Sequence, residues 1–244
     1  MAHNKPRATW PERLALVVVT IVMAYSMLWS SVSTISNTTA TSSQSPTATS
    51  SVAPSAVSTQ TAETIAPSPP TELVIESVGL DLALLDYECP AQDGAVTPPL
   101  TEPDAAHPCY YTNDGLYSLP GGDAPDLAAI FGHTGRGSYS GLDAAPFNRL
   151  YDGLADFDES DPLANFRVQI GDEIRVRTEA SGDAWLVYQI TALYAPEKGT
   201  LADSPVWGDE PRPGVLVLVG CLQQPGLNHS IRNIVVEAEF VGVE

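Results

Sequence analysis

The sequence has 244 residues, of which 30 are acidic and 11 are basic, so the formal net charge at pH 7 is −19. A protein that binds duplex nucleic acid needs the opposite sign of charge, so this composition argues against a nucleic-acid partner. The segment 71–244 holds 28 of the acidic and 8 of the basic residues, so the imbalance belongs to the predicted folded domain. A surface of this kind favours solubility at high salt or in a charged wall matrix.

An uncharged apolar run, residues 14–32, follows a short N-terminal segment, 1–13, that contains Lys5, Arg7 and Arg13. The run has nineteen residues, and a membrane-spanning helix needs roughly 20. Basic residues before such a run keep that end in the cytoplasm. We therefore predict a single-pass signal-anchor in the cell membrane, with the rest of the chain extracytoplasmic. A cleaved signal peptide, whose apolar region is usually shorter, is the alternative.

Residues 33–70 are dominated by Ser, Thr, Pro and Ala and end in Ala66-Pro-Ser-Pro-Pro70. Such a composition has too little apolar surface to offset the entropy lost on ordering. We predict a disordered extracytoplasmic linker, and a flexible chain of this length has a root-mean-square reach of roughly 35 Å. That reach is enough to hold a domain away from the membrane.

From Thr71 to Glu244 the pattern becomes that of a β-domain, with short apolar runs separated by turn residues. The candidate strands are 73–78, 80–85, 127–130, 175–177, 184–194, 215–221 and 234–236. No long amphipathic helix is evident after residue 32. Short strands at this spacing predict an all-β barrel or sandwich.

Three reactive side chains lie at the ends of these predicted strands. The uninterrupted β-branched and apolar run 215–219 is typical of a strand buried on both faces, and it leads through Gly220 to Cys221. Arg232 precedes the run at 234–236, and His133 follows the run at 127–130, with glycines nearby that allow close approach of a substrate. Reactive groups are commonly held in this way at element ends on a rigid scaffold.

The order His133, Cys221, Arg232 resembles that of the sortases, the cysteine transpeptidases of Gram-positive cell surfaces. The segment 217–221 reads Val-Leu-Val-Gly-Cys where that family has Thr-Leu-x-Thr-Cys, so the Leu and the Cys match and both threonines are missing. The segment 129–133, Ala-Ile-Phe-Gly-His, is similar to the family's strand end of small, apolar, Gly and His residues.

Further landmarks extend the resemblance over about residues 71–244. The family's next two sequence landmarks are similar to residues 146–150, Pro-Phe-Asn-Arg-Leu, and to residues 170–176, Ile-Gly-Asp-Glu-Ile-Arg-Val. Residues 232–236, Arg-Asn-Ile-Val-Val, resemble the family's Arg strand, especially that of the actinobacterial class F and E-like enzymes.

The resemblance implies a closed, eight-stranded sortase-like β-barrel with short helices in its loops. It also implies a cysteine transpeptidase or hydrolase that cleaves a Leu-Pro-x-Thr-Gly-like sorting signal of surface proteins. A thioacyl intermediate would form at Cys221, and the acyl group would pass to an amine of a cell-wall precursor. No cofactor and no metal site is implied.

The resemblance assigns a role to each of the three side chains. The Cys221 thiolate is the nucleophile, and His133 takes its proton and returns one to the leaving amine. Arg232, whose guanidinium keeps its charge, is expected to hold the oxyanion of the scissile carbonyl. The alternative for Arg232 is a salt bridge to a carboxylate of this acidic domain.

The three cysteines divide by context. Pairs of cysteines tend to close beyond the membrane, and Cys89 and Cys109 flank a Pro-rich loop without a core of its own. We predict a disulfide between them, worth roughly 3 kcal/mol on a loop-entropy model. Cys221 is then left as the odd thiol that a nucleophile requires. A buried apolar role is the alternative for all three.

Four histidines compete for the role of base. His3 lies in the predicted cytoplasmic segment, and His107 lies in a loop before Cys109. His229 is the main rival of His133, because it stands between Cys221 and Arg232 in the sequence. Only His133 follows an apolar strand, so we assign the base to it.

An acidic stretch, 152–161, contains five carboxylates at mixed spacing. Alternating carboxylates can bind calcium, but this spacing does not match a twelve-residue calcium loop. We interpret the stretch as a solvated acidic loop.

Two other functions remain open. An L,D-transpeptidase also uses Cys and His on a β-scaffold, but its Ser-x-Gly-Cys-x-Arg cluster is not matched by 219–223, Val-Gly-Cys-Leu-Gln. A non-catalytic wall-binding β-domain is the alternative outside the enzymes.

Overall fold

The computed structural model describes residues 64–92, 95–96, 98, 107–135, 145–153, 155–224, 227 and 229–244. The predicted cytoplasmic segment 1–13, the anchor 14–32 and most of the linker 33–70 lie outside these residues. Within the described part of the chain, no helix is both long enough and apolar enough to span a bilayer.

Eight strands form one sheet in the order β2-β1-β7-β8-β10-β9-β6-β5. All neighbours are antiparallel except β6 and β9, which are parallel. Their bounds are Pro70–Ile75 for β1, Leu80–Ala83 for β2, Cys109–Tyr111 for β5, Ala128–Phe131 for β6, Glu173–Thr178 for β7, Leu186–Tyr194 for β8, Val215–Leu222 for β9 and Arg232–Val243 for β10. A separate small hairpin pairs β3, Ala91–Gln92, with β4, Ala95–Val96.

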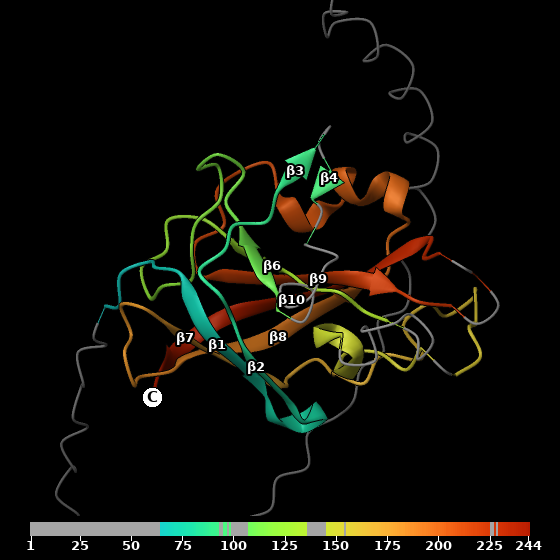
Figure 1. Ribbon diagram of the computed structural model, residues 1–244, viewed down its shortest axis with the longest axis horizontal. Coiled ribbons are helices and arrows are strands. Elements are labelled where there is room, and N and C mark those ends of the chain that lie inside the picture. The colour runs from blue at the N-terminus through green and yellow to red at the C-terminus, as the bar shows by residue number, and fades with distance from the viewer. Residues whose placement is uncertain are drawn as a thin grey trace, which may run out of the picture. The chain divides into compact units, whose positions relative to one another are not determined.

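The sheet is curled but open (Figure 1). Its two edge strands are β2 and β5, and no pairing joins them among the residues that the structure describes. The prediction of a closed eight-stranded barrel is therefore wrong in its closure, although the number of strands is as expected. Both edge strands are short, and β2 lies beside the 3-10 helix η4, Pro146–Arg149. Closure needs a continuous ladder that strands of three and four residues in these positions do not form.

Two apolar layers pack against opposite faces of the sheet. Leu216, Leu218 and Leu222 of β9 belong to the larger cluster, on the face that we call the inner face. Val217 and Val219 belong to the second cluster, on the outer face. The division follows from strand geometry, because successive side chains point to opposite faces.

Short 3-10 helices cover the two faces. The helices η5, Lys198–Asp203, and η6, Pro205–Trp207, lie over the outer face, where Trp207 stacks against Phe131 with ring centroids 6.3 Å apart. On the inner face, η4 contributes the fully buried ring of Phe147. The connection between β8 and β9 thus covers the outer face next to the end of β6.

The folded domain begins before Thr71. Ile65 is buried in the larger cluster, and its carbonyl oxygen accepts a hydrogen bond of 2.8 Å from the N–H of Gly122. The N–H of Ser68 donates to the carbonyl of Pro120 at 3.2 Å. The last residues of the predicted linker therefore pack as an extended segment of the domain, which the Ser- and Pro-rich composition alone does not indicate.

The predicted disulfide between Cys89 and Cys109 is present, with an S–S distance of 2.08 Å. It ties the start of β5 to the segment that follows β2. Cys221 is half-buried and is the one cysteine outside a disulfide, of the three that the sequence contains.

Candidate active site

The parallel pairing of β6 with β9 brings His133 and Cys221 to the same strand end. Phe131 stands opposite Val219, and the N–H of Gly132 donates to the carbonyl of Val219 at 3.0 Å. Two residues beyond this pair are His133, just after the end of β6, and Cys221, still within β9. Alternation from Val219 places Cys221 on the outer face, beside the cover formed by η5 and η6.

Two glycines permit this close arrangement. A Cβ atom at Gly132 would lie 2.8 Å from the ring of Phe147, and a Cβ at Gly220 would lie 3.3 Å from the carbonyl oxygen of Gly132. The methyl group of Thr134 lies 3.4 Å from the same hypothetical Cβ at Gly220. Gly220, which stands where the sortase motif has Thr, is therefore packed against Thr134 and cannot take a larger side chain without displacing a neighbour.

Thr134 also fixes the backbone of the thiol residue. Its hydroxyl donates to the carbonyl oxygen of Cys221, and the residue is only 7% exposed. The side-chain amide of Gln223 donates to the carbonyl of Thr134 at 3.4 Å. Thr134 was not identified from the sequence, where its only signal is its place directly after His133.

Both the imidazole and the backbone of His133 contact backbone groups of other residues. Its Nε2 lies 3.2 Å from the carbonyl oxygen of Pro98, and its own carbonyl accepts a 2.9 Å hydrogen bond from the N–H of Phe147. A carbonyl oxygen only accepts, so Nε2 carries the proton in this contact. In the neutral ring the basic lone pair is then on Nδ1.

His107 and His229 lie elsewhere. The Nδ1 atom of His107 contacts the carbonyl of Ala83, at the end of β2, at 2.9 Å. His229 is exposed in the connection between β9 and β10. His133 is therefore the histidine that sheet pairing aligns with Cys221.

Arg232 is one step out of register with Cys221. It stands opposite Leu222, whereas Asn233 stands opposite Cys221. Alternation places the Arg232 side chain on the inner face, next to Leu222 and Ile234. The structure thus brings His133 and Cys221 together and directs Arg232 initially to the other side of the sheet, so the oxyanion role of Arg232 stays a prediction.

The guanidinium of Arg232 is held by three oxygen atoms. It donates to the carbonyl of Ala195 at 3.1 Å and to the carboxylate of Glu159 at 3.2 Å, and it lies 3.7 Å from the carboxylate of Glu197. Both glutamates are largely exposed. A salt bridge, the alternative considered for Arg232, is therefore present.

The hairpin end between Cys221 and Arg232 is fixed by Ser230. Its hydroxyl oxygen is buried and lies 2.6 Å from the carbonyl of Leu222 and 2.5 Å from that of Arg232. This contact holds the first pair of the β9–β10 ladder, and so it sets which residue faces Cys221.

Glu159 belongs to the acidic stretch 152–161, which is organised by its own hydrogen bonds. The hydroxyl and the N–H of Ser160 donate to the carboxylate of Asp158 at 2.6 and 2.8 Å. The hydroxyl contact lowers the pKa of Asp158. No group of three or more His, Cys, Asp or Glu side chains that could hold a metal ion occurs within the described ranges.

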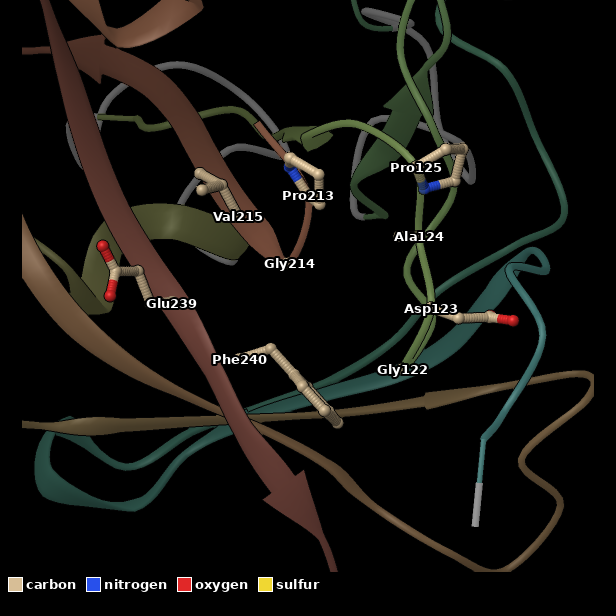
Figure 2. Close-up of a pocket in the computed structure, with 9 residues that line it drawn as sticks. All are labelled: Gly122, Asp123, Ala124, Pro125, Pro213, Gly214, Val215, Glu239 and Phe240. Carbon is tan, nitrogen blue, oxygen red and sulfur yellow. The ribbon is translucent and has the colours of Figure 1, made fainter. Parts of the chain in front are cut away.

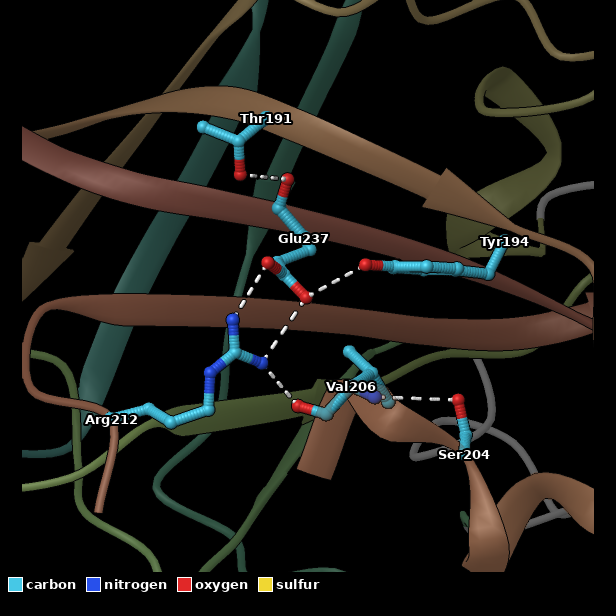
Figure 3. A network of polar contacts seen from close by, with 6 residues as sticks. All are labelled: Thr191, Tyr194, Ser204, Val206, Arg212 and Glu237. Carbon is cyan, nitrogen blue, oxygen red and sulfur yellow. Dashed lines mark hydrogen bonds and ion pairs between the residues drawn. The ribbon is translucent and has the colours of Figure 1, made fainter. Parts of the chain in front are cut away.

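A second Arg–Glu pair lies further along β10 (Figure 3). Arg212 donates to both carboxylate oxygens of Glu237 at 2.7 and 3.1 Å, and the hydroxyl of Tyr194 donates to the same carboxylate at 3.3 Å. The hydrogen bond to Glu237 raises the pKa of Arg212. Arg212 also donates to the carbonyl of Val206, so this pair fastens η6 to the outer face.

A cavity of about 620 Å³ lies away from these groups (Figure 2). It is lined by residues 122–125, 213–215, Glu239 and Phe240. Val215 is the first residue of β9, so the cavity is at the opposite end of that strand from Cys221. Its lining contains none of the predicted site residues.

The chain is similar to solved structures of sortases. These include the sortase D5 transpeptidase of Clostridium perfringens, with 17% identity, a TM-score of 0.42 and coverage of 70% of this chain and 78% of that one. Sortase C-1 of Actinomyces oris has 17% identity and a TM-score of 0.44, covering 72% and 76%. Sortase A of Listeria monocytogenes has 13% identity and a TM-score of 0.44, covering 73% and 90%.

No protein-family model matches the sequence, and no curated protein matches it. The similar structures carry the names of sortases A, C and D, so they do not single out the class F or E pattern of the Arg strand. Likenesses at these TM-scores carry no argument about activity, which must be derived from the residues of this chain.

Proposed function

We propose that this protein is a cysteine transpeptidase of the sortase type. The observation that carries the proposal is the parallel pairing of β6 with β9, which aligns His133 with the one thiol that is not in a disulfide. A thiol and an imidazole positioned at one strand end are the minimal apparatus for acyl transfer through a covalent intermediate.

The reaction follows from these two groups. His133 accepts the proton of Cys221, and the thiolate attacks the scissile carbonyl carbon to form a C–S bond and an oxyanion. The tetrahedral intermediate collapses with cleavage of the C–N bond, and the imidazolium returns its proton to the leaving amine. An acceptor amine then attacks the thioester and releases Cys221.

The substrate and the location are part of the same proposal. The donor is a surface protein with a C-terminal Leu-Pro-x-Thr-Gly-like sorting signal, and the acceptor is an amine of a cell-wall precursor. The domain is extracytoplasmic and is tethered to the cell membrane by the single apolar run 14–32. The disulfide between Cys89 and Cys109 supports an oxidising location, where such bonds persist.

The test is covalent labelling of Cys221 by a sorting-peptide analogue that carries a thiol-reactive group in place of the scissile bond. Mass spectrometry should locate the label on Cys221, and a scrambled peptide with the same reactive group should label far more slowly. His133→Ala should lower transpeptidation of the uncleaved peptide by about 10²- to 10⁴-fold. His229→Ala is the matched control and should keep most of the activity.

One outcome would refute the proposal, and another would change its choice of base. Equal labelling by the true and the scrambled peptide would indicate a thiol without a binding site for the signal. That result would favour a non-catalytic wall-binding domain. A loss of activity in His229→Ala with normal activity in His133→Ala would transfer the base to the other histidine.

A further inference from the structure

Asn233 is the residue directly opposite Cys221 in the sheet. The register of β10 and β9 pairs Asn233 with Cys221, with Val235 and Val219 forming the next pair on the same face. Residues directly opposite in an antiparallel pair have Cβ atoms about 4.5–5.5 Å apart and point to the same side. The amide of Asn233 is therefore a neighbour of the Cys221 sulfur on the outer face.

The environment of Asn233 is unusual for a side-chain amide. The residue is 6% exposed and is the second residue of β10, directly before the buried apolar residues Ile234, Val235 and Val236. Its backbone N–H donates to the carbonyl of Pro196 at 2.9 Å. Its side-chain amide makes no hydrogen bond to any residue that the structure describes.

The amide nitrogen and oxygen of Asn233 are not among the fully buried side-chain atoms that lack a partner, so the amide keeps some access from outside although the residue is largely covered. An apolar residue of similar size would pack better among the valines of this face. An amide that is accessible, unpaired and opposite Cys221 is free to bond a group that arrives with the substrate.

Asn233 and His133 flank Cys221 from the two neighbouring strands. The parallel neighbour β6 supplies the imidazole on one side, and the antiparallel neighbour β10 supplies the amide on the other. The imidazole can exchange a proton with the thiol. An amide N–H has no acid–base function at neutral pH, but it donates a hydrogen bond without losing its proton.

We propose that Asn233 is a catalytic residue whose side-chain N–H donates to the oxyanion formed when Cys221 attacks an acyl carbonyl. The proposal rests on the proposed acyl-transfer function and adds a member to that site. As the C–S bond forms, the π electrons of the carbonyl move to its oxygen, and the amide stabilises this charge. The hydrogen bond weakens when the C=O bond re-forms and the leaving group departs.

The test compares two reactions of the same thiol in the full-length protein. p-Nitrophenyl acetate acylates Cys221 through an oxyanion and releases p-nitrophenolate, whereas iodoacetamide alkylates it by displacing iodide without one. In Asn233→Leu the rate of acylation should fall about 10²- to 10³-fold, the usual loss for one oxyanion donor. The rate of alkylation should stay unchanged.

Two further variants separate this effect from damage to the strand. Val235→Ala removes side-chain volume from the same face two residues away, and both of its rates should stay near those of the wild type. Asn233→Asp keeps the shape of the side chain, so it keeps the test available if Asn233→Leu does not fold. Its acylation rate should fall further, because a carboxylate opposes the developing negative charge.

The outcomes separate this inference from the proposed function. Equal losses of acylation and alkylation in Asn233→Leu would show that the amide supports only the thiol, and undiminished acylation would show that it supports neither. Either result would overturn the inference. If wild-type Cys221 reacts with p-nitrophenyl acetate in an Asn233-dependent way but ignores every sorting peptide, the inference holds and the sortase function fails.

Discussion

Strand β10 carries two Arg–Glu pairs of opposite character. In the middle of the strand, Glu237 is 9% exposed and receives two hydrogen bonds from Arg212 (Figure 3). At its start, the guanidinium of Arg232 is 18% exposed, but the nearer of its two carboxylate partners, Glu159, is 64% exposed. The two cations are similarly covered, at 24% exposure for Arg212 and 18% for Arg232, so the pairs differ in the carboxylate, which is buried in the first pair and exposed in the second.

The difference separates a structural ion pair from an exchangeable one. Removal of one partner from a largely buried bidentate pair destabilises the fold, because the other partner is left as an uncompensated charge. An exposed carboxylate gains little from its contact and is screened by salt. Arg232 can therefore exchange this carboxylate at small cost, which its predicted oxyanion role would require.

The largest effect is expected when the Arg212–Glu237 pair is broken. Glu237→Leu leaves the Arg212 guanidinium without its carboxylate, so the free energy of unfolding should fall by about 3–5 kcal/mol. Urea unfolding followed by circular dichroism measures the change. The double variant Arg212→Met, Glu237→Leu should recover most of the loss, because it removes both charges. If the single and double variants were equally unstable, the loss would lie in packing and not in the charge.

The next effect concerns the rate and not the stability. Arg232→Ala should slow single-turnover acylation of Cys221 by roughly a hundredfold to a thousandfold if the guanidinium stabilises the oxyanion. Arg232→Lys should recover only part of the rate, since an ammonium lacks the planar fork. Thermal melting should shift little, as for an exposed salt bridge. Acylation near the wild-type rate in Arg232→Ala would leave Arg232 as a structural ion-pair residue on the inner face.

Strands β9 and β10 also show what the sequence can and cannot reveal. The continuous apolar run 215–221 predicts β9 almost to the residue, because β-branched residues buried on both faces leave a local signal. For β10 the same reasoning stops at Val236, because Glu237 reads as a break. Its partner, Arg212, lies 25 positions earlier, and no local pattern reveals that the charge is neutralised.

The candidate site divides along the same line. His133 and Cys221 can be found from the sequence because each directly follows an apolar run. Thr134 and Asn233 cannot, because their relation to Cys221 depends on strand register. A slip of one residue would move Asn233 to the inner face and Arg232 to the outer face. The closed barrel expected from the resemblance failed for a similar reason, since closure depends on the edge strands β2 and β5, which are far apart in the chain.

The smallest effect is expected when the Arg232–Glu159 pair is broken at its exposed carboxylate. Glu159→Gln removes the nearer carboxylate from Arg232 and leaves the contact to Ala195 in place. An exposed ion pair contributes about 0.2–1 kcal/mol, so the acylation rate should rise, by at most about fivefold, as the guanidinium is freed.

Glu197→Gln is the matched control for this change. Its carboxylate lies at 3.7 Å from the Arg232 guanidinium instead of 3.2 Å, so its effect should be smaller. The measurement is single-turnover acylation of each variant at low and high salt, and the gain should vanish at high salt, where the exposed contact is already screened. A fall in rate for Glu159→Gln would mean that this carboxylate orients Arg232 for catalysis. The acidic stretch would then have to be counted as part of the active site, because its negative charge would hold the guanidinium in place and not compete with the oxyanion for it.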